Sequence, residues 1–169
     1  MLEIFNNLKP FFEDNYVRIS VREYARMQKI SPPNASQILK NLEKENLLQK
    51  EEDKRYLFFN ANRENLLFIK LQQAYYQVFF KEMITYIEKE TINPTIILFG
   101  SFAKAEMSKN SDIDLAIFTI TKKKLDFKKF EDKFGREIQC FMFKDRDSLK
   151  KNEELLNNIL NGVIIAGGW

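Results

Sequence analysis

The sequence predicts an α+β protein with an N-terminal winged helix-turn-helix, a long connecting helix and a small C-terminal domain built on a mixed sheet. Three observations lead to this prediction. Residues 1–62 show the patterns of a helix, a short strand, two further helices and a hairpin, in that order. An apolar helical pattern without Gly or Pro fills residues 63–90. Residues 91–169 open with the pattern of a buried strand. We therefore treat these three ranges as the parts of the chain.

The winged-helix prediction rests on the order of local patterns at the start of the chain. Apolar residues recur at helical spacing in residues 4–12, and a β-prone stretch follows at residues 16–19. Ser20, with Glu23 three residues later, has the spacing of a capping box at a helix start. A further helix is predicted over residues 33–48, directly after a Ser-Pro break.

A hairpin pattern completes this part: residues 47–61 read LLQKEEDKRYLFFNA, with a predicted turn at 51–53. In a winged helix-turn-helix, the second of the two paired helices enters the major groove of DNA. The candidate contacts to duplex DNA are therefore the polar residues on helix 33–48 and at the wing tip: Asn34, Ser36, Gln37, Lys40, Asn41, Lys44, Lys54 and Arg55. The alternative is a protein-binding or dimerisation module, in which the same polar face is solvated.

Residues 63–90 are predicted as one helix with aromatic residues on more than one side. Such a helix packs against both parts of the chain or against a second copy, so a homodimer is a candidate assembly. Asn93 and Pro94 end the helix. We place the domain boundary inside it.

A candidate phosphate site follows this helix. Residues 95–99 (TIILF) are a continuous apolar, β-branched run, which is typical of a strand buried on both faces. Gly100 and Ser101 come next and lead into a short helical stretch, FAKAEM. Backbone N–H groups at a helix start point at an anion, Gly permits a close approach, and a Ser hydroxyl can donate to a phosphate oxygen.

Two acidic residues lie on the next predicted strand, residues 111–118 (SDIDLAIF). Because side chains alternate along a strand, Asp112 and Asp114 point to one side and Ile113 points to the other. Two adjacent carboxylates repel each other. Cations that bind both carboxylates and a phosphate group offset this repulsion. The pattern indicates hard Mg²⁺ ions, two of which can clamp the attacking and leaving oxygens of phosphoryl or nucleotidyl transfer.

The composition limits the classes of function. Hydrophobic residues make up 44% of the 169 residues, enough for a buried core, and the net charge of +3 is too small to indicate nucleic-acid binding by itself. With no His and one Cys, His-based triads, intramolecular disulfides and thiolate metal clusters are excluded. No apolar run approaches the roughly 18 residues that span a bilayer, and the first residues are unlike a signal peptide. We expect a cytoplasmic protein without membrane contact.

The segment LFGSFAKAEMSKNSDIDL, residues 98–115, resembles the signature of the nucleotidyltransferase superfamily related to DNA polymerase beta, especially its minimal archaeal and bacterial members. The winged helix in front is similar to the arrangement in a group of archaeal predicted nucleotidyltransferases. The resemblance implies Mg²⁺ or Mn²⁺ held by Asp112 and Asp114, and a nucleoside triphosphate, expected to be ATP, as substrate. The residues that it assigns to the nucleotide are Gly100, Ser101, Lys104 (where the family often has Arg) and Ser111.

Two positions depart from the family pattern. Ala105 stands where the family usually has Gly, and its methyl group is either tolerated in a helix or narrows the site. Active members supply a third carboxylate from a later strand, here residues 136–143, and the aligned residue is the neutral Gln139. Glu137 lies about 6.6 Å earlier along an extended strand and is the candidate catalytic acid if the strand slides. The alternative for Glu137 is an ordinary surface acid at a strand end.

Two functions follow as hypotheses. The first is an enzyme that transfers a nucleoside monophosphate to a hydroxyl of a protein or RNA acceptor. Some minimal members of the superfamily act as antitoxins that modify a HEPN-type toxin, so such a protein is one acceptor to test. The second is a DNA-binding transcriptional regulator whose second domain senses nucleotide or only dimerises. Gln139 and Ala105 favour the second hypothesis, and the Gly-Ser and Asp-x-Asp residues favour the first.

Overall fold

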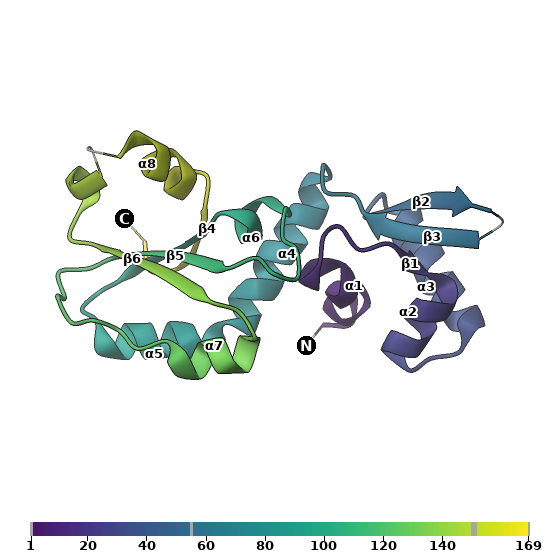
Figure 1. Cartoon of the computed structure of the whole chain (residues 1–169), viewed down its shortest axis with the longest axis horizontal. Coiled ribbons are helices and arrows are strands. Elements are labelled where there is room, and N and C mark those ends of the chain that lie inside the picture. The colour runs from purple at the N-terminus through teal and green to yellow at the C-terminus, as the bar shows by residue number, and fades with distance from the viewer. Residues whose placement is uncertain (1, 55, 150–151, 169) are drawn as a thin grey trace. The chain divides into compact units, whose positions relative to one another are not determined.

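A computed structural model describes residues 2–54, 56–149 and 152–168, and the chain divides into two compact units. Unit 1 comprises Met1–Gln72 and Ala105–Lys109, and unit 2 comprises Gln73–Lys104 and Asn110–Trp169. Figure 1 labels the helices and strands of both units. The division falls within helix α4 (Leu66–Phe79).

Unit 1 has the architecture of a winged helix-turn-helix. Its elements are α1 (Glu3–Glu13), β1 (Ile19–Ser20, later than the predicted stretch), α2 (Val21–Gln28), α3 (Pro32–Lys44), β2 (Leu48–Asp53) and β3 (Tyr56–Ala61). The strands form an antiparallel sheet in the order β1-β3-β2. Two successive helices followed by a hairpin define this fold. Its core is apolar and includes Leu8, Phe11, Tyr24, Leu39 and Phe59, which are all fully buried.

The helix starts in unit 1 follow from their capping residues. Ser20 accepts a hydrogen bond from the Glu23 N–H, and the Glu23 carboxylate accepts one from the Ser20 N–H. The predicted capping box is therefore confirmed. Ser31 accepts a hydrogen bond from the Asn34 N–H at the start of α3, and Pro32 occupies the first helical position, where its missing N–H costs nothing.

Two boundaries in unit 1 differ from the prediction. α3 ends at Lys44 rather than at Leu48, because Leu48 is already paired in β2. The hairpin turn lies at Lys54 rather than at residues 51–53, because strand pairing continues as far as Asp53. Both differences arise because strand pairing extends further than the local residue pattern indicates.

Unit 2 is built on a mixed sheet, as predicted. Besides the end of α4 it contains α5 (Lys81–Glu90), β4 (Thr95–Phe99), α6 (Ser101–Lys104), β5 (Ile113–Phe118), α7 (Lys128–Phe134), β6 (Ile138–Phe143), the 3₁₀ turn η1 (Arg146–Leu149), α8 (Glu153–Leu160) and β7 (Val163–Ala166). The strand order is β6-β5-β4-β7. β5 and β6 run parallel, and the other pairs are antiparallel. The whole chain is therefore α+β.

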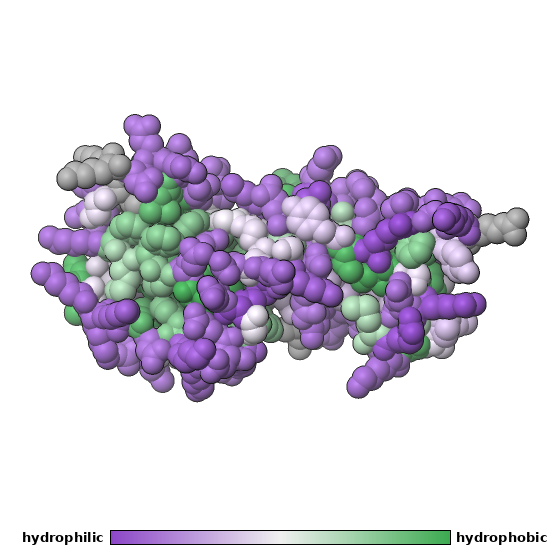
Figure 2. All heavy atoms as spheres, viewed as in Figure 1, coloured by the Kyte–Doolittle hydropathy of each residue, from purple (hydrophilic) through white to green (hydrophobic). Residues whose placement is uncertain are grey.

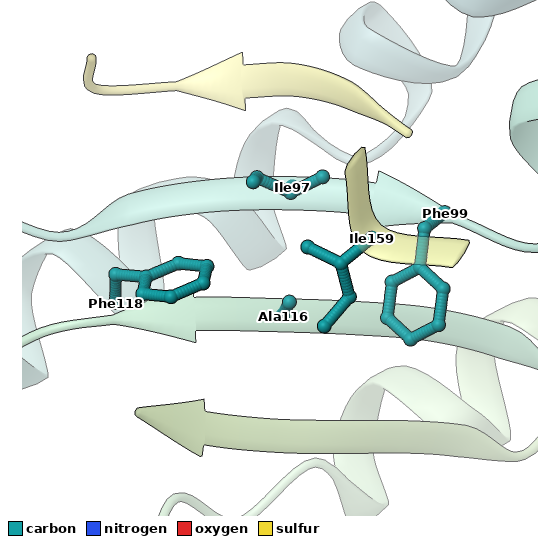
Figure 3. Packing of buried hydrophobic residues seen from close by; sticks show 5 residues of the cluster. All are labelled: Ile97, Phe99, Ala116, Phe118 and Ile159. Carbon is teal, nitrogen blue, oxygen red and sulfur yellow. The ribbon is translucent and has the colours of Figure 1, made fainter. Parts of the chain in front are cut away.

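Helices cover both faces of this sheet: α5 and α7 lie along one face and α8 lies over the other (Figure 1). On the α8 side, the side chains of Ile97, Phe99, Ala116, Phe118 and Ile159 pack together (Figure 3). Every residue of β4 is buried, which explains its continuous apolar run. Apolar side chains also reach the surface over the sheet (Figure 2).

The segment predicted as one connecting helix consists of two consecutive helices, α4 and α5, which meet at Phe80. The hydrogen bonds from the Phe80 N–H to the Tyr76 carbonyl and from the Ile84 N–H to the Phe80 carbonyl continue across the junction. Phe80 is fully buried, and its ring packs against those of Tyr76, Phe79, Phe102 and Phe134. The junction thus lies in an aromatic cluster, without Gly or Pro.

Each helix in the described part of the chain is too short or too polar to cross a bilayer.

Candidate active site

Three segments of unit 2 meet at one end of the sheet. Phe99, the last residue of β4, pairs with Asp114 of β5, and Asp114 pairs with Gln139 of β6. Gly100 follows β4 directly, and Asp112 directly precedes β5. Because neighbouring strands lie about 4.8 Å apart, the Gly-Ser turn, the predicted carboxylate pair and the aligned position of the third acid come together.

Gly100 lies against the Asp114 carboxylate. Its φ is +68°, in the left-handed region that favours glycine. A Cβ atom at this position would lie 2.2 Å from Asp114 Oδ2, far inside van der Waals contact. The glycine therefore serves both the turn and the close approach of backbone and carboxylate.

The electrostatics of the two carboxylates suit a divalent cation. Asp112 and Asp114 are both half-buried. Burial, and then the negative charge of Asp112, raises the pKa of Asp114 to about 6. A pair that resists double ionisation is stabilised when a cation neutralises both charges. The oxygen donors at this strand end fit Mg²⁺ or Mn²⁺, which prefer carboxylate and phosphate oxygens.

Gln139 faces this pair. Its Nε2 donates a hydrogen bond to Asp112 Oδ2 at 2.8 Å. The amide thus uses its donor side on the carboxylate and contributes no negative charge. Gln139 holds the Asp112 side chain in place, but it is a very poor base.

The side chain of Glu137 is exposed, before the start of β6. Its carbonyl accepts a hydrogen bond from the Ile113 N–H at 2.9 Å, which sets the register of β6 beside β5. The hydrogen bond and charge of Asp132, and then the charges of Glu131 and Glu137, raise the pKa of Lys128. In this register Gln139, not Glu137, is level with the carboxylates.

No group of three or more His, Cys, Asp and Glu side chains in the described ranges is placed to hold a metal ion.

Arg136 connects the parts of the site, a role that the sequence did not indicate. Its Nη1 donates a hydrogen bond to the Ser111 carbonyl at 2.7 Å, directly before Asp112. The guanidinium carbon also lies 5.4 Å from the ring centroid of Phe102, in α6. In the sequence, an Arg beside a turn Gly cannot be distinguished from a solvated surface residue.

The other residues assigned to the nucleotide lie on the two connections at this strand end. Ser101 begins α6 and Lys104 ends it, and both are half-buried, as is Ser111 before Asp112. Ala105 is not helical: its φ is 55°, in the left-handed region, and it is fully buried. The family's usual Gly at this position therefore has a backbone reason.

The predicted DNA contacts of α3 form a polar side opposite its buried residues Ala35, Leu39 and Leu42. Gln37 and Asn41 join each other there, with Gln37 Nε2 donating to Asn41 Oδ1 at 2.9 Å. The exposed members are Asn34, Gln37, Lys40, Asn41 and Lys44, and Ser36 is half-buried. The structure thus gathers these residues on one solvent-facing side.

The wing carries acidic residues close to its turn. Lys54 is exposed at the turn, and Arg55 lies outside the described residues. β2 brings Glu51 and Asp53 close to the turn, and Arg18 forms ion pairs with both, at 3.2 and 3.0 Å. These acids weaken the case for phosphate contact at the wing and leave α3 as the better candidate surface.

The raised pKa of Asp114 predicts a pH dependence of stability in the absence of metal. A carboxyl whose pKa is higher in the folded state stabilises the fold at low pH. This contribution is lost as pH rises from about 4 towards 6. Allowing for its solvent contact, we expect a loss of about 1 kcal/mol. Urea unfolding in chelator across this range should show the loss, and Asp114→Asn should remove it. Identical pH profiles would contradict the pKa assignment, and Asp126→Asn, an exposed acid, is the matched control.

Comparison with known proteins bears on the same segments. The family model described as Polymerase beta, Nucleotidyltransferase matches residues 81–166, just over half of the chain. No curated protein matches the chain. Among solved structures, the chain is similar to MepR, a transcription regulator of the Staphylococcus aureus multidrug efflux pump MepA. The identity is 20% and the TM-score 0.41, over 49% of this chain and 60% of that protein. With the Gly-Ser turn and the Asp-x-Asp strand inside the matched range, the chain belongs to the polymerase beta nucleotidyltransferase family.

Proposed function

We propose that the chain binds a nucleoside triphosphate with a divalent cation at the Gly-Ser and Asp-x-Asp end of the sheet and transfers a nucleoside monophosphate to a hydroxyl. The observation that carries the proposal is the packing of Gly100 against Asp114, with Asp112 and Gln139 at the same strand end. A turn with free N–H groups beside two carboxylates supports phosphate and cation binding at this strand end. Membership of the family supports the same chemistry.

Each residue has a defined part in the proposed reaction. Asp112 and Asp114 would hold the cation, which stabilises the charge on the triphosphate. Ser101 and the N–H groups at the start of α6 would donate to phosphate oxygens. The acceptor oxygen forms a bond to the α-phosphorus while the bond to pyrophosphate breaks, and the acceptor proton passes to solvent or to a base. Gln139 cannot take that proton, so the proposed transfer is slow.

Incubation of the whole protein with labelled nucleoside triphosphates, Mg²⁺ or Mn²⁺ and a cell extract tests the proposal. Label attached to a protein or an RNA band, and absent with Asp112→Asn/Asp114→Asn, is the expected result. The labelled species also distinguishes a protein acceptor, such as a toxin, from an RNA acceptor. Equal labelling by wild type and double variant would contradict the proposed site.

A second candidate function is a DNA-binding regulator that binds nucleotide without transferring it. The observation that favours it is Gln139, which fills the position of the third acid with a hydrogen-bond donor to Asp112. Nucleotide binding without labelling of any acceptor, together with duplex binding, is the result expected for this function.

DNA binding is proposed to run through α3. Lys40→Ala with Lys44→Ala should weaken binding to every duplex and reduce the slope of log affinity against log salt by about 1 for each phosphate that the variant no longer neutralises. Gln37→Ala with Asn41→Ala should instead relax sequence preference, with about 1–3 kcal/mol at stake for each good base contact. Fluorescence anisotropy over a salt series with a duplex pool measures both effects.

Lys9→Ala is the matched control, because Lys9 is an exposed lysine on α1 of the same unit. It should leave the affinity and its salt dependence unchanged. If the folded wild-type chain shows no salt-dependent affinity for any duplex, the winged helix is a protein-binding module instead.

A further inference from the structure

Asn15, after the end of α1, makes hydrogen bonds in several directions although it is only 1% exposed. Its Nδ2 donates to the Phe11 carbonyl at 2.8 Å and to Gln72 Oε1 at 2.6 Å. Its backbone N–H donates to the Met107 carbonyl at 2.7 Å, and its Oδ1 accepts from the Met107 N–H at 2.8 Å. The backbone of Met107 is therefore held by two hydrogen bonds, one in each direction.

Met107 belongs to a segment with a special place in the chain. Ala105–Lys109 is part of unit 1, while the residues on both sides of it belong to unit 2. Met107 lies three positions after Lys104 and five before Asp112. The chain can span at most about 11 Å and 18 Å over these distances. Met107 thus lies within the short connection between the two halves of the proposed nucleotide motif.

The segment itself is packed rather than loose. Ala105 and Met107 are both fully buried. Ala105 also adopts a left-handed φ of 55°, which a residue with a Cβ keeps only where the surrounding structure determines it. Packing and hydrogen bonds together therefore define one conformation for this connection.

Asn15 also has an ordinary structural role, which does not account for all its contacts. The bond from Nδ2 to the Phe11 carbonyl satisfies an acceptor near the end of α1, as a C-terminal cap does. That role needs only the side-chain donor. Both bonds to Met107 use other groups, Oδ1 and the backbone N–H, so the contact with this segment is additional.

We infer that Asn15 is a positioning residue of the nucleotide site: by holding Met107 it fixes the connection between the Gly-Ser turn and Asp112. This inference rests on the proposed function, and it extends that function by making nucleotide affinity depend on a residue of the winged-helix unit. Linkage is reciprocal. Loosening Met107 lowers nucleotide affinity, and bound nucleotide protects the Met107 N–H from exchange.

Asn15→Ala in the full chain tests the inference, with Asn62→Ala as the matched control. Asn62 is a buried residue of the same unit, and it bonds to Asn46 and Gln49, away from Ala105–Lys109. Two quantities are measured: hydrogen exchange of the Met107 amide and calorimetric affinity for Mg²⁺-ATP. Asn15→Ala should speed the exchange and weaken the affinity about tenfold, the effect of about one hydrogen bond. Asn62→Ala should change neither by more than about twofold.

In the wild type, Mg²⁺-ATP should slow the exchange of the same amide. Asn15→Ser, which keeps a hydroxyl at the position, provides the test if the alanine variant does not fold. Fast exchange at Met107 with unchanged ATP affinity would overturn the inference and leave the proposed function standing. A wild-type chain that binds no Mg²⁺-ATP would instead overturn the proposed function, and the inference with it. An equal loss of affinity in Asn62→Ala would show a general effect of unit stability and would also overturn the inference.

Discussion

Gln139→Asp is expected to raise the rate of nucleotidyl transfer by about 10²–10⁴-fold, the range that one general base typically contributes. In the chain as it stands, Gln139 is level with Asp114 and donates to Asp112 Oδ2. An amide adds no negative charge and cannot take the proton that the acceptor hydroxyl loses, whereas a carboxylate does both. The effect is measured as the rate of pyrophosphate release from saturating Mg²⁺-ATP. The assay contains the fraction of cell extract whose protein or RNA takes up label in the transfer experiment.

Glu137→Gln is the control for this prediction, and it should change the rate by no more than about twofold. The reason is the register of β6, in which Glu137 precedes the strand and its side chain is exposed. A fast wild type that Glu137→Gln silences would identify Glu137 as the third acid and contradict the assignment of Gln139. Absence of turnover in every variant would favour the regulator over the enzyme.

Gly100→Ala is expected to reduce the affinity for Mg²⁺-ATP by about 100-fold or more and to destabilise the fold by about 1–3 kcal/mol. The added Cβ would meet Asp114 Oδ2 at 2.2 Å, so the carboxylate must move away from the turn. The left-handed φ of +68° adds backbone strain that any residue with a Cβ would carry. Calorimetric titration measures the affinity, and urea unfolding measures the stability.

Gly135→Ala separates these two causes. Gly135 has nearly the same φ, +65°, but nothing lies within 4 Å of its added Cβ. This variant should show the loss of stability that comes from the strain and keep the wild-type affinity. If both variants bind Mg²⁺-ATP alike, the contact of Gly100 with Asp114 has no part in the nucleotide site.

The sequence was sufficient to predict the elements that depend on interactions between residues close together along the chain. The β4 run, the Gly-Ser turn and the alternation that puts Asp112 and Asp114 on one side depend on backbone geometry over a few residues. The capping box at Ser20 is of the same kind. Gly100, Asp112 and Asp114 could therefore be named in advance as candidate site residues, and strand pairing brings them to one end of the sheet.

Features that depend on contacts between distant residues could not be predicted in this way. The junction at Phe80 lies among aromatic rings from several elements, and the helical pattern has no breaker there. The hydrogen bonds of Asn15 with Met107 join residues 92 positions apart. A polar residue after a helix is too common in sequences to indicate such a contact. The ion pairs of Arg18 on the wing are likewise visible only once the strands are paired.

Calorimetric titration of the whole chain with ATP tests whether Asp112 and Asp114 form a metal-dependent nucleotide site. In Mg²⁺, the wild type should bind ATP, and Asp112→Asn/Asp114→Asn should show no metal-dependent binding. In chelator, both proteins should bind equally weakly. The variant should remain folded, because the substitutions remove the burial of a charged carboxylate and its repulsion by Asp112, which together raise the pKa of Asp114. Equal Mg²⁺-dependent binding by wild type and variant would show that the two carboxylates do not form this site.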